Sequence, residues 1–254
     1  MSRVAAMPWR LSANFLPLLA VFLVTAVSLT TGWFDSSVAV FAFVVSGWLI
    51  SLCLHEGAHA LAAYWGGDRS VVEKGYLSLN PLAYADPLTS FGFPLLFLIL
   101  GGIGLPGGAV YINRSVLKNR HWDAFVALAG PMANLVCLVV LGLPFLLGLP
   151  ETTGSPQLWA GMAFLAALQA SAVVLNLLPV PGFDGFAIIR PYLPYEMQAQ
   201  ANAIAPLAMM GFLFLLFTTP VSSAIWNAVY RLAGLFGVYP DFVALGYYLF
   251  RFWR

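Results

Sequence analysis

The chain has 254 residues, of which 61% are hydrophobic and only 8% are charged, and its formal net charge is +1. Soluble domains carry about 25% charged residues, so this composition and a mean hydropathy of +0.88 exclude an ordinary soluble domain and indicate several membrane spans. A net charge this close to zero gives no support for nucleic acid as a partner. Cys53 and Cys137 both fall in apolar stretches, which favours buried free thiols over a disulfide.

Five uncharged stretches are long enough to cross a bilayer, which takes about 20 apolar residues in a helix. They cover residues 11–34, 88–112, 124–150, 152–183 and 197–230. The first is longer than the apolar region of a secretory signal, so we interpret it as a transmembrane helix. A further uncharged stretch, 38–54, continues as a helix to about residue 65. The sequence thus predicts an all-α polytopic membrane protein with about six transmembrane helices.

The stretch 38–54 ends in His55-Glu56-Gly57-Ala58-His59, which is the H-E-x-x-H pattern of zinc proteases. Residues four apart share one face of a helix, so His55 and His59 can bind one metal ion together. The carboxylate of Glu56 can then reach a water molecule on that metal. A zinc site at the end of an uncharged span predicts a hydrolase that acts within the bilayer.

The stretch 88–112 is rich in glycine and proline, so it is a poor helix, and we expect a re-entrant or β-like membrane loop. Its flanks are basic. If it re-enters, one side of the membrane carries Arg3, Arg10, Arg69, Lys74, Arg114, Lys118 and Arg120, and the other carries Asp35 and Glu151. By the positive-inside rule, the amino terminus and the active-site side are then cytoplasmic. The aromatic stretch 232–254 is interrupted by Pro240 and Asp241, which favours an interfacial segment.

Asp184 is the best candidate for the third protein ligand that a catalytic zinc requires. It follows Asn176-Leu-Leu-Pro179-Val-Pro181-Gly-Phe, where the two prolines interrupt helical hydrogen bonding. His55 lies 17 residues after residue 38, and Asn176 lies 17 residues after residue 159, so both motifs fall at about 26 Å along helices that run in the same direction. A glutamate ligand is the alternative, with Glu73, Glu151 and Glu196 as its candidates.

These motifs together resemble the site-2 protease family, the intramembrane zinc metalloproteases of peptidase family M50, and in particular its compact bacterial members. The family's H-E-x-x-H is matched by residues 55–59, its N-x-x-P-x-P-x-x-D-G by residues 176–185, and its A-G-P-x-x-N by residues 129–134. The stretch from Asn80-Pro81 to Asp86-Pro87 is similar to the N-P…D-P element of compact bacterial members. The resemblance therefore extends over most of the chain.

The resemblance implies one transmembrane protease domain over residues 1–254, with a core at about 38–190 made of the helices 38–65, 124–149 and 152–183. It implies one zinc ion held by His55, His59 and Asp184, with Glu56 as general base and Asn176 orienting the substrate or stabilising the oxyanion. It also implies transmembrane protein substrates in the cell membrane. Cleavage of such a substrate requires an unwound segment whose backbone finds new partners, and residues 73–79 and 101–108 are the candidates for an extended edge that supplies them. The chain departs from the family's Lys-Pro-Val-Pro element at residues 105–110 and has Phe186 after Asp-Gly, and we find no PDZ-like or CBS-like module.

A polytopic ion transporter or channel is the alternative function, because broken helices and buried ionisable residues also mark transporters. In that case His55, Glu56 and Asp184 would relay ions. No inverted repeat is visible in the sequence, and the ionisable residues within spans form a single cluster, so the protease is favoured. The sequence leaves open the substrate, the need for a prior cleavage and the oligomeric state.

Overall fold

The computed structural model describes residues 11–33, 36–84, 110–152, 154–218 and 220–254, and these residues form helices and turns with no strand among them. Four described helices are long and apolar enough to cross a membrane: α2 (Ser36–Gly66), α5 (Arg120–Leu146), α7 (Pro156–Asn176) and α9 (Tyr195–Thr218). α1 (Phe15–Thr31) is apolar but shorter, with 17 residues. The predicted all-α membrane protein is confirmed at this level, while the described residues show fewer full-length spans than the six expected.

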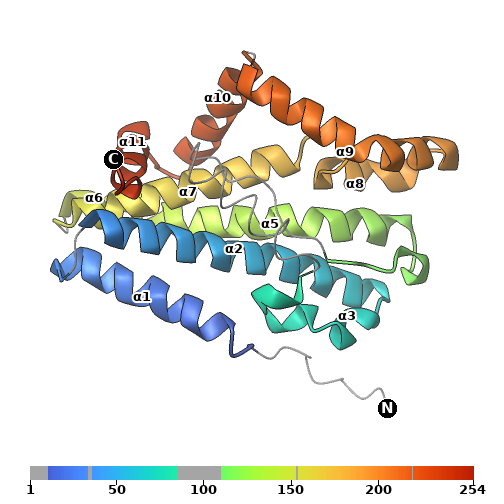
Figure 1. Cartoon of the computed structure of the whole chain (residues 1–254), viewed down its shortest axis with the longest axis horizontal. Coiled ribbons are helices and arrows are strands. Elements are labelled where there is room, and N and C mark those ends of the chain that lie inside the picture. The colour runs from blue at the N-terminus through green and yellow to red at the C-terminus, as the bar shows by residue number, and fades with distance from the viewer. Residues whose placement is uncertain (1–10, 34–35, 85–109, 153, 219) are drawn as a thin grey trace.

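Three of these helices, α2, α5 and α7, pack against one another as the centre of the molecule (Figure 1). α2 and α7 run in the same direction and α5 runs against them, so α2 and α7 end on the same side of the bundle. The positions of His55 and Asn176 in the sequence predicted this parallel direction of α2 and α7. α7 is the most enclosed of the four spans: 83% of its most apolar 18-residue stretch is buried, compared with 11% for α9. Its buried alanines, among them Ala160, Ala163 and Ala166, let the neighbouring helices approach closely.

Short elements gather where α2 ends: α3 (Ser70–Glu73), η1 (Tyr76–Ser78), η2 (Pro81–Ala83) and η4 (Arg114–Val116). Lys118 N donates to Gly66 O at 2.9 Å, and Lys74 Nζ donates to Tyr111 O at 2.8 Å. Asn113 N donates to the buried carboxylate of Asp68 at 2.7 Å. The residues before 85 and after 109 therefore lie together at one end of the bundle.

The expected β-like loop is only partly open to comparison. Most of the stretch 88–112, including the glycine-rich turn at 101–108, lies outside the described residues. Residues 73–79, the other candidate for an extended edge, form the end of α3 and the 3-10 helix η1 instead. The prediction of a strand edge there is wrong, because Gly75 and Leu79 both take the left-handed conformation, with φ of 74° and 52°, and curl the chain.

The carboxy-terminal third differs from the expected single span at 197–230. The helix α9 ends at Thr218, and α10 (Val221–Gly234) runs in a different direction (Figure 1). Pro220 stands at this break, and it has no backbone N–H with which to continue the helical hydrogen bonding of α9. After α10, the aromatic segment forms α11 (Pro240–Phe250), which packs against α7 and α2 with Phe250 fully buried.

The contact between α11 and α7 depends on Gly246, because a Cβ built there would overlap the carbonyl oxygen of Ala160 and lie 2.7 Å from Phe164 Cβ. Gly246→Ala is expected to destabilise the protein by about 1–3 kcal/mol, as overpacking of a close contact does. Gly211→Ala on α9, where a Cβ meets nothing within 4 Å, is the matched control. Thermal unfolding in detergent or nanodiscs gives the comparison, and equal melting temperatures would contradict the packing argument.

Candidate metal centre

Both histidines of the H-E-x-x-H motif lie on the same face of α2, near its carboxy-terminal end. His55 and His59 are 6% exposed, and Glu56 between them is 2% exposed. Four residues of helix bring the two imidazole rings to a centroid distance of 4.7 Å. The uninterrupted helix thus presents two nitrogen donors side by side, as the sequence predicted.

Asp184 reaches the same point from another part of the chain. α7 ends at Asn176, the turn 177–183 reverses the backbone, and Asp184 is the first residue of the short helix α8 (Asp184–Ile189). Gly185 makes this approach possible, because a Cβ there would overlap the carbonyl of Leu177. The Asp-Gly pair is therefore more than a turn signal: the glycine lets α8 dock on the end of α7 and directs Asp184 at the histidines.

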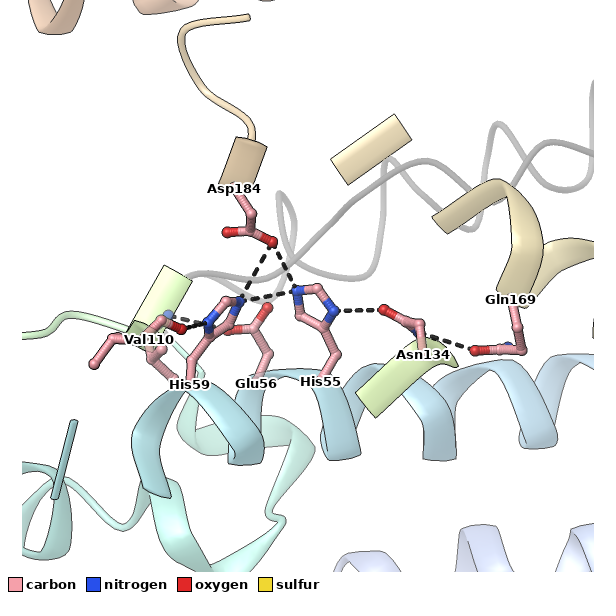
Figure 2. Close-up of polar contacts among 8 residues, drawn as sticks. His55, Glu56, His59, Val110, Asn134, Gln169 and Asp184 are labelled. Carbon is pink, nitrogen blue, oxygen red and sulfur yellow. Dashed lines mark hydrogen bonds and ion pairs between the residues drawn. The ribbon is translucent and has the colours of Figure 1, made fainter. Parts of the chain in front are cut away.

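The three side chains have the spacing of a metal-binding group (Figure 2). The Nε2 atoms of His55 and His59 are 3.0 Å apart, and Asp184 Oδ2 lies 3.3 Å from the first and 3.5 Å from the second. Donor atoms about 2.0–2.1 Å from a tetrahedral zinc ion are about 3.3 Å from one another. These residues fit a zinc ion with three protein ligands.

The outer nitrogen of each ring is held by α5. His55 Nδ1 lies 2.5 Å from Asn134 Oδ1, and His59 Nδ1 lies 2.6 Å from the backbone oxygen of Val126. Both partners are acceptors, so Nδ1 carries the proton in each ring and Nε2 is left with its lone pair toward Asp184. This is the tautomer that a metal ligand requires.

Asn134 is itself held by a chain of buried amides. Asn134 Nδ2 donates to Gln169 Oε1 at 2.9 Å, Gln169 Nε2 donates to Ser51 Oγ at 2.9 Å, and Ser51 Oγ donates to Trp48 O at 2.7 Å. The chain ends at a backbone carbonyl, which can only accept, so every member has one orientation. Ser51, Asn134 and Gln169 come from α2, α5 and α7, and the network therefore joins the three central helices beside His55.

Gly130 leaves the space that the imidazole rings occupy. A Cβ at this position would overlap His59 Nε2 and lie 2.6 Å from His55 Nε2. The stretch Gly130-Pro131 would suit a simple kink in α5, but in the structure its glycine faces the metal centre. Gln169 and Ser51 were missed from the sequence, although a glutamine inside an uncharged span is costly enough to signal a function.

Glu56 lines a cavity of about 410 Å³ together with both histidines, Asp184 and Asn176. Its Oε2 accepts a hydrogen bond from Val110 N at 3.2 Å, which fixes the carboxylate beside the cavity. Asn176 is the last residue of α7 and is 4% exposed. All five predicted site residues therefore line one cavity.

The alternative glutamate ligands do not take part. Glu73, Glu151 and Glu196 are exposed on α3, α6 (Leu149–Thr152) and α9, and none belongs to the metal-binding group. The cysteines are free, as expected, with Cys53 buried and Cys137 half-buried.

Similar proteins are found among bacteria. The chain is 43% identical to the predicted zinc metalloprotease Rip2 of Mycolicibacterium smegmatis over 97% of each chain. It is 45% identical to the Rip2 protein of Mycobacterium tuberculosis over 84% of this chain and 82% of the relative. It is 32% identical to the predicted zinc metalloprotease YwhC of Bacillus subtilis, over 71% of this chain and 82% of the relative. No family model and no solved structure matches the chain.

The hydrogen bond that His55 donates to Asn134 predicts a role for Asn134 in metal affinity. Asn134→Ala removes the acceptor that fixes the His55 tautomer, so we expect zinc affinity to fall about 10- to 100-fold, as it does when such partners of metal ligands are lost. Asn227→Ala, which removes an asparagine of α10 outside the site, is the matched control. Competition with a zinc chelator measures both affinities. Wild-type affinity in Asn134→Ala would show that the ring is oriented by packing alone.

Proposed function

The chain belongs to the site-2 protease family of zinc metalloproteases, and from this premise we propose that it hydrolyses peptide bonds within or near transmembrane segments of other membrane proteins. The observation that carries the proposal is the meeting of four side chains in one cavity: His55, Glu56 and His59 lie on α2, which is long enough to span a membrane, and Asp184 begins the short helix α8.

In this proposal His55, His59 and Asp184 bind one zinc ion per chain. A zinc ion in this place would supply Lewis acidity to the scissile carbonyl and a water molecule whose pKa is lowered to about 7. Glu56 is the general base: its carboxylate takes the proton of the attacking water and passes it to the leaving amine. The bond from Val110 N engages one carboxylate oxygen, Oε2, and so orients the group for this transfer.

We assign Asn176 the role of holding the substrate carbonyl. Its side chain lines the cavity at the carboxy-terminal end of α7, a short turn before Asp184. No hydrogen bond within the described residues engages its amide, which leaves the amide available as a donor. An amide can stabilise the oxyanion that forms as water attacks.

The substrate of such a site is a polypeptide whose backbone is locally exposed. A transmembrane helix satisfies its carbonyls internally, so attack requires unwinding and new partners for the exposed groups. Because 73–79 is not an extended edge, those partners have to come from the cavity walls or from segments outside the described residues. The cavity is lined by apolar side chains such as Val110 and Met209 beside the polar site residues, which suits it to an unwound apolar segment.

We propose that the amino terminus and the site end of the bundle are cytoplasmic and that 88–112 re-enters on that side. Two observations support this orientation. The basic residues Arg69, Lys74, Arg114 and Lys118 lie at the site end, as the positive-inside rule asks of a cytoplasmic face. The two sides of the stretch are joined there by hydrogen bonds from Lys118 N to Gly66 O and from the Lys74 side chain to Tyr111 O.

An ion transporter needs a succession of polar groups across the membrane. Within the part of the chain that the structure describes, one group of three or more His, Cys, Asp or Glu side chains has metal-binding spacing, and it consists of His55, His59 and Asp184. No specific observation favours transport over proteolysis.

A series of variants separates the proposed roles. Glu56→Gln is expected to keep one zinc per chain and lose cleavage, whereas His59→Ala and Asp184→Ala lose both. Asn176→Ala is expected to keep zinc and lower kcat about 10- to 1000-fold, because it removes a donor to the oxyanion. Metal analysis of purified protein gives zinc content, and membrane proteomics of cells with wild-type or Glu56→Gln enzyme reveals the substrates that accumulate. Full activity of Glu56→Gln, or unchanged zinc affinity of Asp184→Ala, would refute the assignment.

Single cysteines test the orientation, in a background that lacks Cys53 and Cys137. Cysteines at Ser78 and Ser115 are expected to react with a membrane-impermeant thiol reagent only from the cytoplasmic side. A cysteine at Thr31, at the far end of α1, should react only from outside. Labelling of the Ser115 position from outside would mean that 88–112 crosses the membrane.

A further inference from the structure

Two arginines line the proposed active-site cavity and share one carboxylate. Arg114 lies on η4 and Arg190 on η5 (Arg190–Tyr192), and both side chains reach the cavity that contains Glu56. Asp123, in the first turn of α5, forms ion pairs with both, at 3.1 Å to Arg190 Nη2 and through its other oxygen to Arg114 Nη1. Among the described residues, two guanidinium groups are thus balanced by one carboxylate.

These guanidinium groups have capacity for a further anion. The Arg114 side chain is 36% exposed and that of Arg190 is 16% exposed. The Nε–H of Arg190 has no acceptor within the described part of the chain. Burial, and then the neighbouring Arg114, lower the pKa of the Arg190 guanidinium, which Asp123 only partly opposes. A second anion at this wall would relieve the repulsion between the two cations.

The helices give the distance from this wall to the metal centre. Asp123 lies seven residues before Gly130 on α5, which is about 10 Å, and Arg190 lies six residues after Asp184, which is about 9 Å of helix. Both estimates start at residues that touch the metal centre. An extended peptide advances about 3.3 Å per residue, so this backbone separation corresponds to about three residues of substrate.

We propose that Arg114 and Arg190 form a carboxylate-binding subsite that selects substrates with an acidic group about three residues from the scissile bond. This inference rests on the proposed protease function and adds a substrate preference to it. The carboxylate can belong to an Asp or Glu side chain or to the carboxy terminus of a substrate that has already been shortened. Both present the same planar group to the guanidinium donors.

Peptide hydroxamates test the subsite by binding alone. The hydroxamate chelates zinc and so fixes the register of the peptide. Two peptide series extend to either side of the hydroxamate, and in each a glutamate is placed in turn at the first five positions. Peptides with glutamine at the same positions are the neutral reference. A parallel set of shortened peptides carries a free terminal carboxylate instead. Calorimetry with zinc-loaded protein in nanodiscs is expected to show about tenfold tighter binding for glutamate than for glutamine at the third position, on one side only.

In Arg114→Gln and in Arg190→Gln, glutamate and glutamine peptides are expected to bind with about equal affinity. Asp123 keeps one arginine partner in each variant. Arg69→Gln is the matched control: it removes the same charge from the same end of the bundle, where Arg69 stacks on Tyr64 and does not line the cavity. A gain only in the shortened set would assign the carboxylate to the substrate terminus.

Equal affinities for glutamate and glutamine peptides in the wild type, or a preference that both arginine variants retain, would overturn the subsite. The reference peptides report separately on the metal centre. If their binding is unaffected when zinc is removed, the proposed function is contradicted, whereas a flat glutamate scan with zinc-dependent binding contradicts only the subsite.

Discussion

The packing of α5 against α2 is the contact on which the candidate site depends. Val126, Gly130 and Asn134 repeat every four residues along α5, as His55 and His59 do along α2. Because the helices are antiparallel, Val126 meets His59, Asn134 meets His55, and Gly130 stands between them without a side chain. A shift of either helix by one residue would break both hydrogen bonds and drive a side chain into the rings.

This alignment of α5 with α2 is stabilised by polar side chains, which find no hydrogen-bond partners in the surrounding lipid. The hydrophobic effect contributes little to helix association in a bilayer, whereas close packing of small residues and hydrogen bonds between helices stabilise it. The bonds from Asn134 to Gln169 and from Gln169 to Ser51 join three helices, and low polarity around them strengthens each bond. The alanines of α7 complete the arrangement, since they allow the helices to come close enough for short amide side chains to meet.

Much of this could be predicted from the sequence, because the chemistry is written in rare residues. With only three histidines in an apolar chain, residues 55–59 identified two candidate ligands, and the interrupted helix before Asp184 identified the third. The side chains that hold Asn134 in place were missed, since Gln169 and Ser51 have no fixed spacing to the motif and meet Asn134 only after three helices pack. The break between α9 and α10 was hidden for a similar reason: Pro220 lies in an uncharged run, and composition does not show where a helix changes direction.

The positions of the three proposed ligands along the chain determine when, during synthesis, the site can first form. His59 and Asp184 are separated by 125 positions in the chain. At about 5–20 residues per second, a ribosome needs roughly 6 to 25 s to add that length. During this interval α2 is already made while α8 is not, so the nascent protein has a histidine pair but no complete site. The membrane-insertion machinery, itself rich in transmembrane segments, therefore handles this protease before it is able to cut.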